Sequence, residues 1–298
     1  MTVTEEKLQV ILITYNREKV LKRTLVALLA NDSPIRNCDI LVLDNNSTDG
    51  TGNCVTQIKE THMNLSYQKN KYNLGISGNI YKAMEAASKE YYWIVCDDDF
   101  YDWSAWQEVE EAMSCGEDMI VVARYCLPDD RTNETAFLMR QYSFVGGAVV
   151  KTAILNDNVM RNAVDNIYTL FPHLVPMVAL INQNKKIHVI SRAIVAYGRD
   201  LETDCSYTRG SDKDELYPRT VKMSWMLGYA GICSGIKEKS LREKVFITGF
   251  VSGFDNLHNY VKSKYDLSED KLFVEELLLS LNEEQREIVN KQLFDVEP

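Results

Sequence analysis

Apolar runs that alternate with helical patterns constrain the fold of this chain more than any other feature. Leucines at 21, 25 and 28 have helical spacing after the first run, and apolar residues at 76, 80, 83 and 84 have it after the third. The runs are QVILIT (9–14), DILVLD (39–44), LSYQ (65–68), YWIVC (92–96) and MIVVA (119–123). Short strands separated by amphipathic helices predict an α/β fold, with a mostly parallel sheet flanked by helices.

Polar clusters stand at the ends of three of these runs. They are Thr14–Arg17, Asp44–Ser47 and Asp97–Asp99. The carboxyl ends of parallel strands meet at one edge of the sheet, which is where α/β sheets bind ligands. Three adjacent carboxylates repel one another unless a cation lies among them. The pattern therefore predicts a functional site at this edge; taken alone, the acidic triplet could also be a solvated turn.

Composition excludes several classes of protein. The net charge of −10 and the pI near 5.0 do not suit nucleic-acid binding, which needs a basic face. Seven cysteines with no C-x-x-C pair argue against a disulfide scaffold and against a zinc site. The first residues do not resemble a signal peptide, and no stretch of about 18 apolar residues could span a membrane. We therefore expect a cytoplasmic protein with reduced thiols.

Familiar nucleotide motifs are missing from the predicted sheet. No G-x-G-x-x-G follows the first strand, which disfavours a dinucleotide-binding fold. No G-x-x-x-x-G-K-[ST] is present either, which excludes a P-loop. A sugar-1-phosphate nucleotidyltransferase would be expected to carry a Gly-rich loop with Arg after that strand, and the chain lacks it.

Four stretches, in this order, carry a family resemblance: VILITYNREKVLKRTLVALL, DILVLDNNSTDGT, NKYNLGISGNIYKAM and YWIVCDDDFYD. Together they resemble family 2 glycosyltransferases of the GT-A fold. The arrangement around FVGGAVVK and FPHL is similar to that of the bacterial enzymes that add sugars to surface polysaccharides. The resemblance is clear over residues 8–125 and extends to about 200. It implies a metal-dependent, inverting transfer of one sugar from a nucleoside diphosphate sugar to a hydroxyl acceptor.

The resemblance also implies roles for the first two polar clusters. Tyr15 offers a flat face to the donor base, and Thr14 and Arg17 flank the same slot. Asp44 can accept from a base N–H or a ribose hydroxyl, and Asn46 lies beside it. The alternative for Asp44 is helix capping or turn chemistry, although Ser47 and Asp49 are available for that task.

The loop NLGIS follows the third run, and in the family this loop lies against the nucleotide. Asn73 and Gly75 are the predicted contacts, because glycine allows close backbone approach. The alternative is an ordinary glycine turn that Ser77 caps.

The acidic triplet corresponds to the family's D-x-D element. By analogy Asp99 binds Mn²⁺ or Mg²⁺ directly, since hard carboxylate oxygens suit both ions and both bind diphosphate. Asp97 reaches ribose, a metal-bound water or the metal itself, and Asp98 can share either role. The triple run leaves the register open by one position.

No motif marks the general base, because no Glu-Asp pair appears where the family usually has one. Asp165, at the start of a helix-like segment, is the first choice, and His173 is the second. His173 could equally be a packed or capping histidine, and Asp157 fits a helix end. Gly146 and Gly147 are expected on the acceptor side.

The remaining part of the chain is expected to be helical. We divide the chain into a nucleotide-sugar-binding and catalytic domain (1–200) and a helical region (201–298) for acceptor binding, packing or oligomerisation. Arg199, Arg209 and Lys213 could close over the diphosphate, although loop charges are usually solvated. The chain lacks a Q-x-x-R-W element and membrane spans, so we expect one sugar per encounter rather than processive synthesis.

The predicted acceptor is a growing glycan or a lipid-linked glycan. Peripheral contact with the inner face of the membrane and a homodimer are both compatible with the sequence. Two alternatives are a sugar-1-phosphate nucleotidyltransferase and a non-catalytic, glycosyltransferase-like binding subunit.

Overall fold

The computed structural model describes residues 2–122, 142–185, 187–196, 226–251 and 276–293, together with residues 135 and 139. Arg199, Arg209, Lys213 and the predicted domain boundary near 200 lie outside these ranges. The strands are β1 (Leu8–Thr14), β2 (Asp39–Asp44), β3 (Leu65–Lys69), β4 (Tyr91–Cys96), β5 (Phe100–Tyr101), β6 (Met119–Val121), β7 (Ala148–Lys151), β8 (His188–Val189) and β9 (Val195–Ala196). The α-helices are α1 (Val3–Lys7), α2 (Glu18–Leu28), α3 (Thr51–Lys59), α4 (Gly75–Glu85), α5 (Trp106–Ser114), α7 (Asp157–Asp165), α8 (Val175–Asn182), α10 (Lys239–Phe246) and α13 (Glu283–Leu293). The short 3₁₀ and π turns are η1 (Trp103–Ala105), η3 (Val145–Gly147), η4 (Thr152–Ile154), η5 (Ile167–Thr169), η6 (Pro172–Leu174) and η7 (Ile247–Val251).

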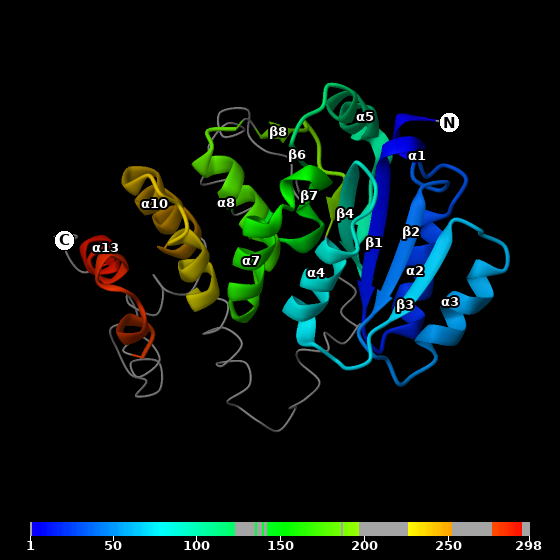
Figure 1. Ribbon diagram of the computed structural model, residues 1–298, viewed down its shortest axis with the longest axis horizontal. Coiled ribbons are helices and arrows are strands. Elements are labelled where there is room, and N and C mark those ends of the chain that lie inside the picture. Colours follow the sequence, from blue (N-terminus) through cyan, green and yellow to red (C-terminus); the bar gives the residue numbers. More distant parts are fainter. Residues whose placement is uncertain are drawn as a thin grey trace.

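The main sheet has the strand order β3-β2-β1-β4-β7-β6-β8, and β5 and β9 form a separate ribbon. β1 lies between β2 and β4 and pairs in parallel with both (Figure 1). β7 is antiparallel to its neighbours β4 and β6. Thr14 lies opposite Asp44, and Ile13 lies opposite Cys96. This register places Asp97 level with the last residues of β1 and β2, as the polar strand ends predict.

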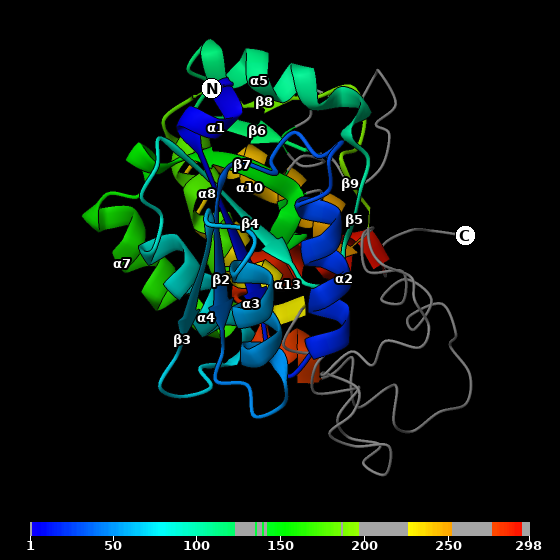
Figure 2. The same cartoon turned by 90° about the vertical axis from the view of Figure 1, so that its right-hand side faces the viewer.

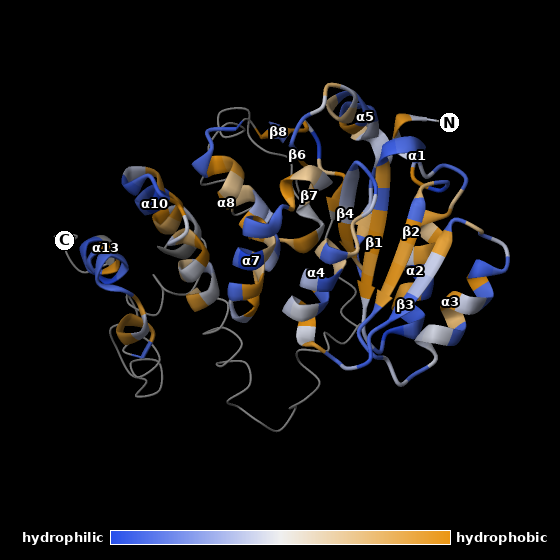
Figure 3. Cartoon of the chain, in the orientation of Figure 1, coloured by the Kyte–Doolittle hydropathy of each residue, from blue (hydrophilic) through white to orange (hydrophobic). Residues whose placement is uncertain are grey.

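Helices cover both faces of the sheet. α2 and α3 pack side by side on one face, together with α5, and α4 packs on the other (Figure 2). Residues of β1 alternate between the two sides: Val10 and Leu12 face the α2 side, while Ile11 and Ile13 face the α4 side. All of β1 is buried, and each large aliphatic side chain removed from water contributes about 1.5–3 kcal/mol. In Figure 3 the hydrophobic colour of β1 and β2 gives way to hydrophilic loops at their carboxyl ends.

The described part of the C-terminal region is helical, as expected. Residues 226–251 and 276–293 pack on the α8 side, and Tyr229, Phe246 and Val289 share one core with α8. Arg242 and Glu284 form a two-pronged ion pair that ties α10 to α13, with the closest N···O distance 2.9 Å. Among the described residues, no helix combines the length and the apolar character needed to cross a bilayer.

Several elements were not anticipated from the sequence. α1 precedes the first strand, and β7 takes an antiparallel place beside β4. Gly146 and Gly147, expected only on the acceptor side, therefore lead directly into a strand inside the sheet. The predicted fifth strand ends at Val121 rather than Ala123, which lies outside the described residues.

Candidate functional site

The ends of β1 and β4 are joined by side-chain hydrogen bonds. The hydroxyl of Thr14 donates to Asp97 Oδ2 at 2.7 Å. Arg17 Nη1 lies 2.8 Å from Asp97 Oδ1 and 2.8 Å from Asp98 Oδ2, so one nitrogen serves two carboxylates. Thr24, on α2, donates to the backbone oxygen of Asp97 at 2.5 Å. The structure thus brings together Thr14, Arg17, Asp97 and Asp98, which the sequence had placed at one edge.

Burial and charge act in opposite directions on this cluster. Burial raises the pKa of Asp97 to about 6, although Arg17 and Thr14 favour its ionised form. Burial also disfavours a charged Arg17, but the charges of Asp97 and Asp98 outweigh that effect, and the net pKa of Arg17 is raised. Arg17 is therefore a permanent cation held between two acidic side chains.

Asp99 supplies the third carboxylate and is only 2% exposed. One ligand atom each from Cys96, Asp98 and Asp99 lies within 4.8 Å of the others. Burial and the neighbouring carboxylates raise the pKa of the Cys96 thiol well above its ordinary value, so the thiolate that a metal would need is disfavoured. The usable donors are carboxylate oxygens, which suit Mg²⁺ or Mn²⁺. A side chain on Gly146 would begin 3.5 Å from Asp99 Oδ2, so the bare glycine keeps this approach open.

Asp44 is fully buried and its carboxylate is already engaged. One oxygen accepts from the Ser47 amide at 2.8 Å and from the Ser47 hydroxyl at 2.6 Å. The other oxygen accepts from the Tyr67 hydroxyl at 2.6 Å. Asp44 therefore performs the turn chemistry that was the alternative interpretation, and its nucleotide contact stays a prediction. Tyr67 was missed, because its position in the third run carried only a strand signal.

Asn45 fastens the NLGIS loop to the end of β2. Its amide nitrogen donates to Asn73 Oδ1 at 2.7 Å and to the Gly75 carbonyl at 3.1 Å. Its oxygen accepts from the Leu74 amide at 2.9 Å. Gly75 has a φ of 69°, a left-handed conformation that favours glycine. Asn73 and Gly75 are exposed, and Asn45 holds both in place. The sequence did not single out Asn45, which is only 3% exposed, because the neighbouring Asp44 carried the stronger signal.

Tyr15 and Asn46 are half-buried at the same edge. The loop of Asn16 between β1 and α2 is bound to the loop after β2. The backbone N–H of Asn16 donates to the Ser47 hydroxyl at 2.8 Å, and the side-chain oxygen of Asn16 accepts from the backbone N–H of Thr48 at 2.7 Å. These bonds hold the β1–α2 loop and the β2–α3 loop next to each other.

The two candidate bases differ in environment. Asp165 is exposed and is the last residue of α7, so its expected place at the start of a helical segment is wrong: that helix begins after the cap Asn156. His173 is 1% exposed, donates from Nε2 to the Ser143 carbonyl at 3.1 Å, and meets the Tyr142 ring edge-on. Burial lowers the pKa of His173 to about 4, which leaves a neutral imidazole at pH 7.

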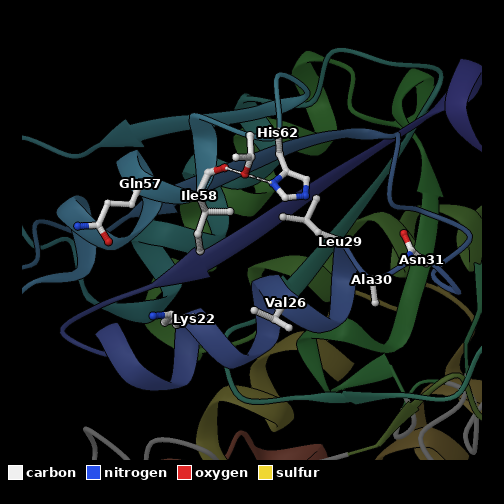
Figure 4. Close-up of a pocket in the computed structure, with 9 residues that line it drawn as sticks. Lys22, Val26, Leu29, Ala30, Asn31, Gln57, Ile58 and His62 are labelled. Carbon is white, nitrogen blue, oxygen red and sulfur yellow. Dashed lines mark hydrogen bonds between the residues drawn. The ribbon is translucent and has the colours of Figure 1, made fainter.

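A cavity of about 560 Å³ lies elsewhere, between α2 and α3 (Figure 4). It is lined by Lys22, Val26, Leu29, Ala30, Asn31, Gln57, Ile58, Thr61 and His62. None of these residues belongs to the carboxyl-edge cluster. We assign the site by the chemistry of its side chains, because open volume alone does not recognise a ligand.

The fold and the carboxylate cluster define a protein of the GT-A class. The model of "Glycosyl transferase family 2" matches residues 9–156, and the chain belongs to this family. A Mycoplasma pneumoniae protein described as an uncharacterized glycosyltransferase, MG025 homolog, is 31% identical over 118 residues, which is 39% of each chain. Its Mycoplasma genitalium counterpart is 29% identical over 138 residues, 46% of this chain and 45% of that one. The matched part thus spans less than half the length of these relatives.

Solved structures show the same fold at low identity. S. aureus TarS 1-349 superposes with a TM-score of 0.66 at 18% identity, covering 96% of this chain and 84% of that chain. Its complex with UDP-GlcNAc gives a TM-score of 0.67 at 19% identity, covering 96% and 85%. The mannosyltransferase PcManGT from Pyrobaculum calidifontis, in complex with GDP-Man and Mn²⁺, gives 0.56 at 14% identity, covering 98% and 88%. The predicted fold and family are confirmed.

Proposed function

We propose that this protein transfers one sugar from a nucleoside diphosphate sugar to a hydroxyl acceptor, with a divalent cation bound by the acidic triplet. The observation that carries the proposal is the group of three carboxylates at the strand ends, two of which share Arg17. Similar structures contain UDP-GlcNAc in one case and GDP-Man with Mn²⁺ in another, which supports the donor class.

Asp99 and Asp98 are the residues that we expect to hold the cation, with Asp97 as a further ligand or a ribose contact. When bound, the cation would neutralise the charge that develops on the leaving nucleoside diphosphate. Tyr15 is expected to stack on the base, whereas Thr14 holds Asp97 in position. Asp44, Asn46, Asn73 and Gly75 complete the predicted donor slot.

An inverting transfer requires a base that takes the acceptor hydroxyl proton as the oxygen attacks the anomeric carbon. Asp165 suits this role better than His173, because its side chain is exposed and an acceptor hydroxyl can reach its carboxylate oxygens. The Nε2 proton of His173 is already donated to a carbonyl, and its low pKa makes it a weak base. We therefore propose Asp165, with an oxygen of its carboxylate as the proton acceptor.

The acceptor is proposed to be a growing or lipid-linked glycan, reached from the cytoplasm through peripheral contact with the membrane. We also propose that the protein transfers one sugar per encounter and that it forms a homodimer. The acidic net charge of −10 continues to disfavour a nucleic acid as partner.

Thermal unfolding with nucleoside diphosphates tests the proposal, because a ligand of the native state raises the midpoint. UDP and GDP are each tested with and without Mn²⁺, and sugar release from the matching donor is then measured. We expect a Mn²⁺-dependent shift with one nucleotide and donor hydrolysis that needs the metal. The variant Asp99→Asn removes a proposed metal ligand. It should lose the Mn²⁺-dependent shift, and its rate of donor hydrolysis should fall by at least about 100-fold.

Asp102→Asn is the matched control. Asp102 caps the next turn by accepting from the Ser104 amide at 2.9 Å, and asparagine caps equally well. Full activity of Asp99→Asn would contradict metal catalysis and favour a non-catalytic binding subunit. Release of pyrophosphate from a nucleoside triphosphate and a sugar phosphate would instead establish the nucleotidyltransferase.

A further inference from the structure

Arg17 occupies the place of a counter-ion within the acidic cluster. Its Nη1 atom is 2.8 Å from an oxygen of Asp97 and 2.8 Å from an oxygen of Asp98. The side chains are 14%, 5% and 17% exposed, respectively, so solvent screens the contacts little. The guanidinium therefore neutralises part of the charge that a divalent cation would otherwise find at the triplet.

We infer that Arg17 couples cation binding to donor binding. This inference rests on the proposed function and concerns the regulation of the same site. A divalent cation that enters alone meets the buried guanidinium of Arg17, which contacts two of the three carboxylates. Two positive charges this close together repel each other strongly, because solvent screens the site only weakly. A diphosphate supplies the anion to which Arg17 can turn, since a guanidinium matches phosphate oxygens. Metal and nucleotide then favour each other's binding.

The neighbouring Arg23 shows why position matters more than charge. It also lies on the α2 side of the triplet, but its guanidinium stacks over the Phe100 ring at 4.6 Å. It approaches the triplet at the backbone oxygen of Asp98, at 3.5 Å, rather than at the carboxylate of that residue. Arg23 thus provides a control of equal charge on the α2 side, and we place it outside the donor site.

Coupling of this kind is a thermodynamic quantity and can be measured without turnover. Mn²⁺ affinity is determined by electron paramagnetic resonance for the full chain, in the absence and the presence of UDP or GDP. For Arg17→Gln we expect Mn²⁺ alone to bind at least about tenfold more tightly than to the wild type, which corresponds to about 1.4 kcal/mol. The further tightening caused by the nucleotide should shrink by a similar factor.

Arg17→Lys keeps a positive charge but loses the planar guanidinium, so we expect a smaller gain of about threefold in Mn²⁺ affinity. This variant also serves if Arg17→Gln does not fold. Arg23→Gln should leave the Mn²⁺ affinity close to that of the wild type, with a smaller change than either Arg17 variant. Equal gains in Arg17→Gln and Arg23→Gln would show a general charge effect and overturn the inference.

Unchanged or weaker Mn²⁺ binding by the folded Arg17 variants would also overturn the inference, because Arg17 would then act as a structural ion pair only. The proposed function fails separately. If wild-type protein binds neither Mn²⁺ nor any nucleotide, the donor site itself is refuted. If wild-type protein binds both and the Arg17 variants show no gain, only the coupling role of Arg17 is lost.

Discussion

Replacement of Asn45 by alanine should both destabilise the fold and loosen the NLGIS loop. The Asn45 side chain donates hydrogen bonds to Asn73 and Gly75 and accepts them from Leu74 and Asn70. Water can replace the first two, because Asn73 and Gly75 are exposed. The bond from Asn70 is buried and the bond from Leu74 is partly buried, and each donor left without a partner there costs about 1–1.5 kcal/mol. We therefore expect a loss of about 2–3 kcal/mol in the free energy of unfolding.

Denaturant unfolding of wild type, Asn45→Ala and Asn45→Asp measures this value. Aspartate keeps the acceptor for Leu74 and Asn70, but its second oxygen faces the oxygens of Asn73 and Gly75, so we expect a destabilisation of similar size from repulsion rather than from lost acceptors. Faster hydrogen exchange at the Leu74 amide should accompany the alanine variant only. A change in unfolding free energy below about 0.5 kcal/mol, with unaltered exchange, would refute the view that Asn45 holds the loop.

Two further predictions concern stability. The lowered pKa of His173, about 4, means that below pH 6.5 the unfolded chain takes up a proton that the folded chain excludes; stability should therefore fall as the pH drops from 6.5 towards 4, by up to about 3 kcal/mol. Denaturant unfolding at several pH values should show this fall in the wild type and a smaller fall in His173→Gln. An identical change of unfolding free energy with pH in both proteins would contradict the prediction. Gly228→Ala would place a Cβ 1.8 Å from the Thr169 carbonyl oxygen and should cost about 3 kcal/mol or more, whereas Gly231→Ala, with its nearest contacts at 3.6 Å, should be neutral or slightly stabilising. Equal melting temperatures of the two alanine variants would show that the close approach at Gly228 is not required.

A local sequence pattern predicts structure where that pattern has one physical solution. The run LQVILIT is buried along its full length, as a strand covered on both faces must be, and the helix after it begins at Glu18. The acidic triplet lies at the predicted edge for the same reason: parallel strands that end together bring their following residues together.

The sequence by itself determined the α/β fold, the family and the edge at which Asp97–Asp99 lie. Only the tertiary structure decided which side chains neutralise them. No spacing rule links Arg17 with Asp97 and Asp98, about eighty positions away, because β1 and β4 become neighbours only when the sheet forms. The same holds for Asn45, whose importance depends on the loop that folds back onto it. Local periodicity reports which residues face a core, whereas long-range pairing decides which polar groups meet.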